Sequence, residues 1–164
     1  IKGCIMSFLT KKSVQRAEKF LRDYDPNLRV ISLDTSARTA LDAAKSLNCP
    51  EGAIVKSLLF SADDSFILCL VSGDKKASFN KLKKNLIIEK IEMAKAEDVK
   101  RVTGYTIGGV SPVGHLKKID IFIDNNLDRF KELFAAAGHP NCVFKIDFKN
   151  LVKITNGSIM SITE

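Results

Sequence analysis

The sequence AIVKSLLF at residues 53–60, followed by SADD at 61–64 and SFILCLV at 65–71, decides the fold of this chain. The two outer segments are rich in β-branched and apolar residues, which favour strands, and the polar tetrapeptide between them is typical of a turn. We therefore expect an antiparallel β-hairpin over residues 53–71.

Lys56 is the one charged residue of the first segment. Because side chains alternate along a strand, Lys56 should share a face with Ile54 and Leu58, while Ser57 lies on the other face. Both faces are largely apolar, and an ammonium group is costly to bury without an anionic or carbonyl partner. The pattern predicts that Lys56 points into a cavity that receives such a group. The alternative is an edge-strand lysine that blocks aggregation.

Further elements are expected on both sides of the hairpin. Helical spacing of apolar residues behind Ser or Thr caps predicts helices at 13–22, capped by Ser13, and at 39–47, capped by Thr39 or Ser36. Apolar stripes predict helices at 79–86, 96–102 and 148–152, and strands are expected at 28–33, 119–123, 142–146 and 159–162, with a helix or strand up to Ala137. This order indicates an α+β domain with a curved, mostly antiparallel sheet.

The chain has 164 residues, 45% of them hydrophobic, and a net charge of +7. This predicts a single domain over residues 1–164 whose core needs no metal or disulfide to hold it together. No apolar run approaches the roughly 18 residues of a membrane-spanning helix, and residues 1–9 are too short for a secretory signal. The four cysteines are far apart and Cys69 lies in an apolar run, which favours reduced thiols and a cytoplasmic location.

Positive charge is concentrated in one section of the chain. Residues 75–101 hold nine basic and four acidic residues, so +5 of the total +7 lies there. Such clustering attracts phosphate polyanions and makes their binding depend on salt. The alternative is a solvated helix face. No aromatic run of the RNA-recognition type and no zinc-finger spacing accompanies the section, so readout of base sequence is not indicated.

The segment GYTIGGVSPVG at 104–114 contains four glycines and Pro112. Adjacent glycines permit positive φ and let a ligand approach main-chain N–H groups, while the proline stiffens the loop. Such a loop suits a phosphate, a ribose or a carbonyl oxygen. It lacks the spacing of a P-loop or a dinucleotide fingerprint, and a connecting turn without a ligand is the alternative.

The usual catalytic residue sets are poorly represented. The only histidines are His115 and His139, and His139 with Cys142 would supply half of a metal site whose other half is missing, so we expect no metal and no cofactor. No motif supports a Cys–His or Ser–His nucleophile. An enzyme with this sequence should act by positioning and electrostatics.

Several segments together resemble the YbaK-type aminoacyl-tRNA deacylases, which share their fold with the editing domain of bacterial prolyl-tRNA synthetase. The likeness runs from about residue 39 to 162. It is carried by the lysine strand at 53–60, by GGVSP at 108–112, which matches the family's G-x-x-x-P loop, and by AGHPN at 137–141 with LVKITNG at 151–157. The resemblance implies a barrel-like mixed sheet with flanking helices.

The resemblance also implies an activity, namely hydrolysis of the ester that links a wrongly attached amino acid to the 3′-terminal ribose of a tRNA. Alanine or cysteine on proline tRNA is the preferred substrate, with serine and threonine as alternatives. The implied partners are the acceptor end of aminoacyl-tRNA and prolyl-tRNA synthetase. The family uses neither a metal nor a covalent intermediate.

Roles for individual residues follow from the same resemblance. Lys56 would anchor the terminal nucleotide or the aminoacyl group, and main-chain amides of residues 108–111 would hold the carbonyl oxygen while water attacks, assisted by the ribose 2′-hydroxyl. Ser57 and His139 match positions that shape the amino-acid pocket in some relatives. The predicted catalytic set is Lys56, Gly108, Gly109 and Ser111, and the predicted substrate-binding set is Ser57, Pro112 and His139.

Three other interpretations remain open. The chain could be a non-catalytic tRNA-binding or synthetase-associated module. It could be an appendage excised from a larger synthetase, which the first residue other than Met and the unmatched residues 1–26 allow. A nucleotide-binding protein would need the glycine loop but not the basic section.

Overall fold

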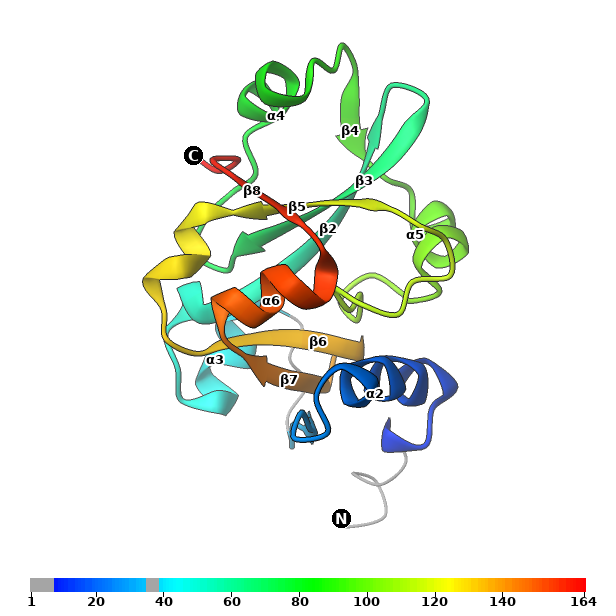
Figure 1. Cartoon of the computed structure of the whole chain (residues 1–164), viewed down its shortest axis with the longest axis vertical. Coiled ribbons are helices and arrows are strands. Elements are labelled where there is room, and N and C mark those ends of the chain that lie inside the picture. Colours follow the sequence, from blue (N-terminus) through cyan, green and yellow to red (C-terminus); the bar gives the residue numbers. More distant parts are fainter. Residues whose placement is uncertain (1–7, 35–38) are drawn as a thin grey trace.

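The computed structural model describes residues 8–34 and 39–164 (Figure 1). The expected hairpin is formed by β2 (Ile54–Ala62) and β3 (Ser65–Ser72). The remaining strands are β1 (Val30–Ser32), β4 (Ile91–Met93), β5 (Asp120–Asp124), β6 (Leu133–His139), β7 (Cys142–Ile146) and β8 (Ser158–Met160). The α-helices are α2 (Lys12–Tyr24), α3 (Ala40–Leu47), α4 (Phe79–Leu86), α5 (Ala96–Thr103) and α6 (Phe148–Thr155), and two 3₁₀ turns are η1 (Glu51–Ala53) and η2 (Asn125–Arg129).

The strands form one curled mixed sheet in the order β1-β7-β6-β2-β3-β5-β8, with β4 paired to β2 off this path. Antiparallel pairs join β1 to β7, β6 to β7, and β2 to both β3 and β4, whereas β2–β6, β3–β5 and β5–β8 are parallel. The hairpin therefore lies in the middle of the sheet. The predicted α+β class with a curved mixed sheet is confirmed.

Apolar clusters cover both faces of the hairpin. Val55, Leu59, Leu68 and Leu70 pack into the main core, which also includes the buried face of α2. On the other face, Ile54 packs with residues of α3, β6 and β7, and farther along the strand Phe60 packs with Leu82 of α4. Strand β2 is thus covered at both ends on the face that carries Lys56, as its two-sided apolar pattern indicated.

The edge of β2 opposite β3 is shared by two strands. Strand β6 pairs with β2 only as far as Val55, and β4 pairs with it only from Phe60 onward. One further bond on this edge runs from the Ala94 N–H to the Leu59 carbonyl, at 3.1 Å. Residues 56–58 lie between these contacts and pair with β3 alone in the described chain. The sheet therefore has an opening beside Lys56.

Most predicted elements are confirmed, but the Ser13 cap is wrong. Helix α2 begins at Lys12 after a cap residue with no side-chain cap bond, and the Ser13 hydroxyl instead donates to the Gly138 carbonyl at 2.9 Å. The Thr39 cap of α3 is confirmed, because its side chain accepts from the Asp42 N–H at 3.1 Å. The alternative cap, Ser36, lies outside the described residues.

The segment up to Ala137, expected as a helix or strand, contains the 3₁₀ turn η2 and strand β6, in agreement with the expectation. One difference concerns the short strand β4, which lies within a section where the sequence predicts only helices. No helix in the described ranges is long and apolar enough to cross a bilayer.

Candidate functional site

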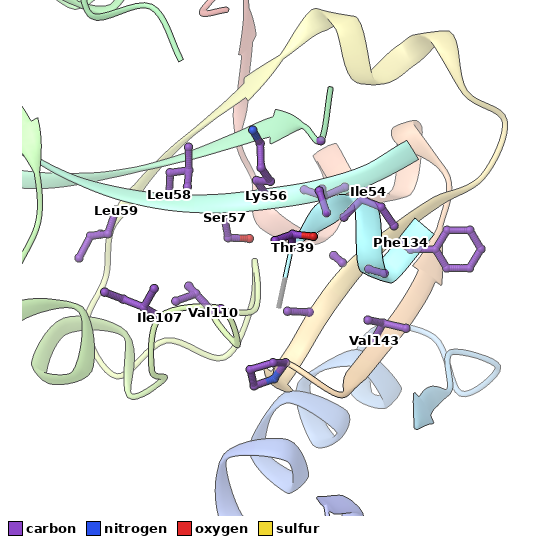
Figure 2. Close-up of a pocket in the computed structure, with 18 of the residues that line it drawn as sticks. Thr39, Ile54, Lys56, Ser57, Leu58, Leu59, Ile107, Val110, Phe134 and Val143 are labelled. Carbon is purple, nitrogen blue, oxygen red and sulfur yellow. The ribbon is translucent and has the colours of Figure 1, made fainter. Parts of the chain in front are cut away.

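A cavity of about 490 Å³ lies at the opening in the sheet (Figure 2). Most of its wall comes from residues 54–59 of β2, the start of α3 with Thr39, the loop residues Ile107, Gly108 and Val110, residues 134–136 of β6, and Pro140 in the turn after β6. The rest comes from single residues of neighbouring segments, which are Glu51, Gly73, Met93, Ala94, Val99 and Val143. Most of these residues are apolar, so the few polar groups at the wall fix the chemistry of the cavity.

Lys56 lies at this cavity, on the opposite face of β2 from Ser57 (Figure 2). The predicted alternation is thus confirmed. The Lys56 Nζ donates a hydrogen bond to the Lys75 carbonyl oxygen at 2.6 Å. Burial lowers the pKa of Lys56, while the negative charges of Glu51 and Asp74 oppose this shift. A protein carbonyl therefore holds the ammonium group on the face of β2 opposite Ser57, with one of its three N–H donors occupied.

The loop that carries the Lys75 carbonyl is braced by Arg129. The Arg129 guanidinium binds both carboxylate oxygens of Asp74, at 2.8 and 3.2 Å, and donates to the Ser72 hydroxyl at 2.9 Å. This forked contact holds the pKa of Asp74 below its usual value. The position of Lys56 thus depends on a residue of η2, far from it in the sequence.

Ser57 points into the cavity toward Ile107 and Val110 (Figure 2). Its Oγ is buried and has no hydrogen-bond partner among the residues that the structure describes. A buried polar atom without a partner costs free energy, so the Ser57 hydroxyl is a candidate contact for a ligand in this cavity.

The glycine loop reaches the cavity through Gly108. This residue has φ +89°, a conformation that favours glycine, and a Cβ at this position would have no heavy atom nearer than 3.5 Å. Gly109 has a different role, because a Cβ there would lie 2.8 Å from the His139 Cα. Gly109 therefore permits close packing of the loop on the turn between β6 and β7.

Ser111 and Pro112 are buried and are not among the residues that line the cavity. The Ser111 hydroxyl accepts from the Val113 N–H at 3.3 Å, and its carbonyl oxygen lies 2.7 Å from the His115 Nε2. A carbonyl oxygen only accepts, so this nitrogen of His115 carries the proton. Ser111 thus stabilises the loop through these hydrogen bonds.

His139 also lies outside the cavity wall. Its Nδ1 accepts from the Asn141 N–H at 3.0 Å, and its ring stacks on Phe8 with the centroids 4.3 Å apart. Burial lowers its pKa, with a smaller contribution from Lys11. Of the predicted site residues, the structure brings Lys56, Ser57 and Gly108 to the cavity, whereas Gly109, Ser111, Pro112 and His139 are not part of its wall.

Other cavity residues were not predicted. Pro140 lies inside the AGHPN segment at 137–141, which carries part of the resemblance, and the sequence predicts Thr39 only as a helix cap. Met93 and Phe134 have no sequence signal that separates a cavity residue from a core residue. In residues 8–34 and 39–164, no group of three His, Cys, Asp or Glu side chains is arranged to hold a metal ion.

Residues 34–154 match the family model of the aminoacyl-tRNA editing domain. The chain belongs to this family. It is 34% identical over 130 residues to the proline–tRNA ligase of Caldicellulosiruptor saccharolyticus, which covers 77% of this chain and 21% of the ligase. The chain thus spans about a fifth of the length of that ligase.

Two further comparisons cover most of both chains. The chain is 32% identical over 123 residues to the uncharacterized protein YwhH of Bacillus subtilis, which covers 74% of this chain and 78% of YwhH. A crystal structure described as a proposed trans-editing enzyme for prolyl-tRNA synthetase superimposes with a TM-score of 0.89 at 32% identity, over 94% of this chain and 98% of that one. The resemblance found in the sequence is confirmed at the level of family and fold.

Proposed function

We propose that this editing-domain protein is an aminoacyl-tRNA deacylase that removes alanine or cysteine from mischarged proline tRNA. The observation that carries the proposal is the meeting of Lys56, Ser57 and Gly108 at one largely apolar cavity of about 490 Å³. The family match and the likeness to a proposed trans-editing enzyme support aminoacyl-tRNA as the substrate class.

Lys56 anchors the 3′-terminal nucleotide in this proposal. Its ammonium group uses one N–H donor on the Lys75 carbonyl and keeps two for a phosphate or ribose oxygen. Because burial makes the charged form of Lys56 costly, an anionic ligand beside it gains more than it would at an exposed lysine.

The glycine loop acts on the reacting ester. Water adds to the ester carbonyl carbon, and main-chain N–H groups near Gly108 stabilise the oxygen that becomes negative. The bond to the ribose 3′-oxygen then breaks, and this oxygen leaves with a proton as the hydroxyl of the tRNA. The ribose 2′-hydroxyl helps to hold the attacking water. No covalent intermediate with the protein is needed.

The apolar walls favour a small side chain. Residues such as Val110 and Ala135 border the cavity and offer no polar partner to a larger polar side chain. One methylene group changes selectivity by only about 1 to 3 kcal/mol. We therefore expect a graded preference among amino acids. The tRNA itself would be selected by contacts outside the cavity, with prolyl-tRNA synthetase as a partner.

The test is a deacylation panel. Proline tRNA charged with alanine, cysteine, serine, threonine or proline is incubated with the protein, and release of each amino acid is compared with spontaneous hydrolysis. The proposal predicts release of alanine or cysteine and sparing of proline. Tight binding of these tRNAs without release of any amino acid would instead favour the non-catalytic tRNA-binding module.

A further inference from the structure

Ser57 occupies the middle of the opening in the β2 edge. The ladder with β6 ends at the Val55–Ala135 pair, and beyond the gap the edge is taken up by the bond between Ala94 and Leu59, followed by the ladder with β4. In the described chain, no strand pairs with Ser57 on this edge.

The main chain of Ser57 faces the opening. In a strand, the N–H and C=O groups of one residue point to the same edge, and those of the next residue point to the opposite edge. The Leu59 carbonyl accepts from Ala94 on the open edge, so the N–H and C=O of Ser57, two residues away, point to that edge as well. Both groups therefore face the open edge rather than β3, and Ser57 is among the residues that line the cavity.

The side chain of Ser57 adds a third polar group. Within residues 8–34 and 39–164, its Oγ is buried without a partner, as is that of Ser32, but Ser57 alone of these two lines the cavity. One residue thus presents a donor, an acceptor and a hydroxyl to a largely apolar space. Buried polar groups are normally paired, so this set is suited to a ligand.

We propose that the aminoacyl group docks on Ser57 as a single-residue extension of the sheet. The ester carbonyl of the substrate accepts from the Ser57 N–H, and its α-ammonium group donates to the Ser57 carbonyl. An aminoacyl ester carries its nitrogen and its carbonyl on one α-carbon, as a residue of a neighbouring antiparallel strand does, so both bonds form together. This inference rests on the proposed function and assigns the recognition of the α-amino acid to main-chain atoms.

This arrangement explains how a cavity could accept several small amino acids. Main-chain hydrogen bonds recognise the α-ammonium and carbonyl groups that all amino acids share, and the Ser57 hydroxyl contacts the side chain, which differs between them. The same edge could receive a peptide strand instead, which is an outcome that the experiment separates.

A proline at position 57 tests the N–H contact. Ser57→Pro removes the hydroxyl and the N–H, whereas Ser57→Ala removes the hydroxyl only. Because the missing N–H faces the open edge, the pairing with β3 is retained. We expect alanyl-tRNA deacylation by Ser57→Pro to be roughly tenfold or more slower than by Ser57→Ala. Equal rates for two folded variants would overturn the inference.

A second measurement does not depend on the proline variant. The ¹⁵N-labelled wild-type protein is titrated with 3′-(L-alanylamino)-3′-deoxyadenosine, a non-hydrolysable mimic of the charged tRNA end. The Ser57 amide should shift and become protected from hydrogen exchange. A silent Ser57 amide at saturation, no binding of the mimic, or protection only by an added β-strand peptide would overturn the inference.

These results separate the inference from the proposed function. If the Ser57 amide is protected by the mimic but alanyl-tRNA is not hydrolysed, the docking stands and the deacylase proposal fails. If alanyl-tRNA is hydrolysed while the Ser57 amide stays silent, only the docking fails.

Discussion

Lys56 donates its hydrogen bond to a main-chain carbonyl, that of Lys75, and not to a carboxylate. A carboxylate at 2.6 Å would neutralise the ammonium group and compete with an anionic ligand. A carbonyl orients the group and leaves its charge available. The carbonyl itself lies on a loop that Arg129 braces through Asp74 and Ser72.

Arg129 should therefore act on catalysis through Lys56. Arg129→Met removes the fork to Asp74, and we expect kcat to fall several-fold with a smaller change in KM, because the lysine is misplaced but still present. Arg129→Lys should not rescue the rate, since lysine cannot form the fork. A matched control is Lys145→Met, which removes the exposed ion pair with Glu132. Equal kinetics for both Met variants would contradict this role.

The two glycines of the loop should respond differently to alanine. Gly109→Ala places a Cβ 2.8 Å from the His139 Cα, so we expect the loop to move off the turn, with a loss of about 2 kcal/mol of stability and most of the activity. Gly108→Ala places a Cβ in ordinary contact with Pro140 at 3.5 Å but has φ +89°, which costs about 1 to 2 kcal/mol. Urea denaturation and deacylation assays compare the variants. A more damaging Gly108→Ala would refute the role of Gly109 in packing.

Low pH should lower the stability of the folded protein through protonation of His115, which contacts the glycine loop at Ser111. Burial lowers the pKa of His115 from its ordinary value of 6.5, and the nearby positive charge of Arg16 adds to this. The unfolded chain then binds protons more readily than the folded one, so stability is full above about pH 7 and falls as the pH drops through 6.5 toward the folded value. The pKa of His139 shifts in the same direction.

Thermal unfolding from about pH 8 to pH 5 measures this dependence. His115→Gln should flatten the pH dependence of Tm, and His139→Gln should flatten it less, because His139 is less deeply placed. An unchanged slope in His115→Gln would show that other groups control acid stability.

Binding of tRNA should depend on the basic section. Lys83 and Lys84 of α4 are exposed. We expect Lys83→Glu/Lys84→Glu to weaken binding of non-hydrolysable aminoacyl-tRNA and to reduce the slope of log Kd against log salt by about 0.7 to 0.9 for each phosphate that the protein no longer neutralises. Lys149→Glu/Lys153→Glu on α6 makes the same change in net charge outside the section. An equal effect of both pairs would point to net charge alone.

Local patterns were enough to predict the hairpin and most helices. Segments 53–60 and 65–71 carry strand composition on both sides of a polar turn, and the structure pairs them in register. Both ends of α3 could also be predicted. Thr39 is a favourable N-cap residue, and Asn48 tolerates the left-handed conformation that it adopts at the C-cap. These features depend on neighbours in sequence.

What could not be predicted depends on distant partners. Strand β4 has three residues and exists because it completes the edge of β2. Serine is a favoured N-cap residue, but the Ser13 hydroxyl donates to the Gly138 carbonyl, which is distant in the sequence. The strand pattern singled out Lys56, and the family resemblance singled out Ser57, whereas the opening beside them follows from where β6 and β4 stop.

The central claim is that the positive charge of Lys56 at the cavity is required to remove a mischarged amino acid. Lys56→Met keeps nearly the length of the side chain and removes the charge. Burial already lowers the pKa of Lys56, which means that its charged form is disfavoured in the folded protein, so this variant should unfold at an equal or higher temperature near neutral pH.

The most direct measurement is the single-turnover rate of alanyl-tRNA(Pro) deacylation by wild type and Lys56→Met, with folding checked by Tm. We predict that the variant is slower by about 10- to 150-fold, corresponding to a charged hydrogen bond of about 1.5 to 3 kcal/mol. A folded Lys56→Met protein that clears alanyl-tRNA(Pro) at the wild-type rate would contradict the claim.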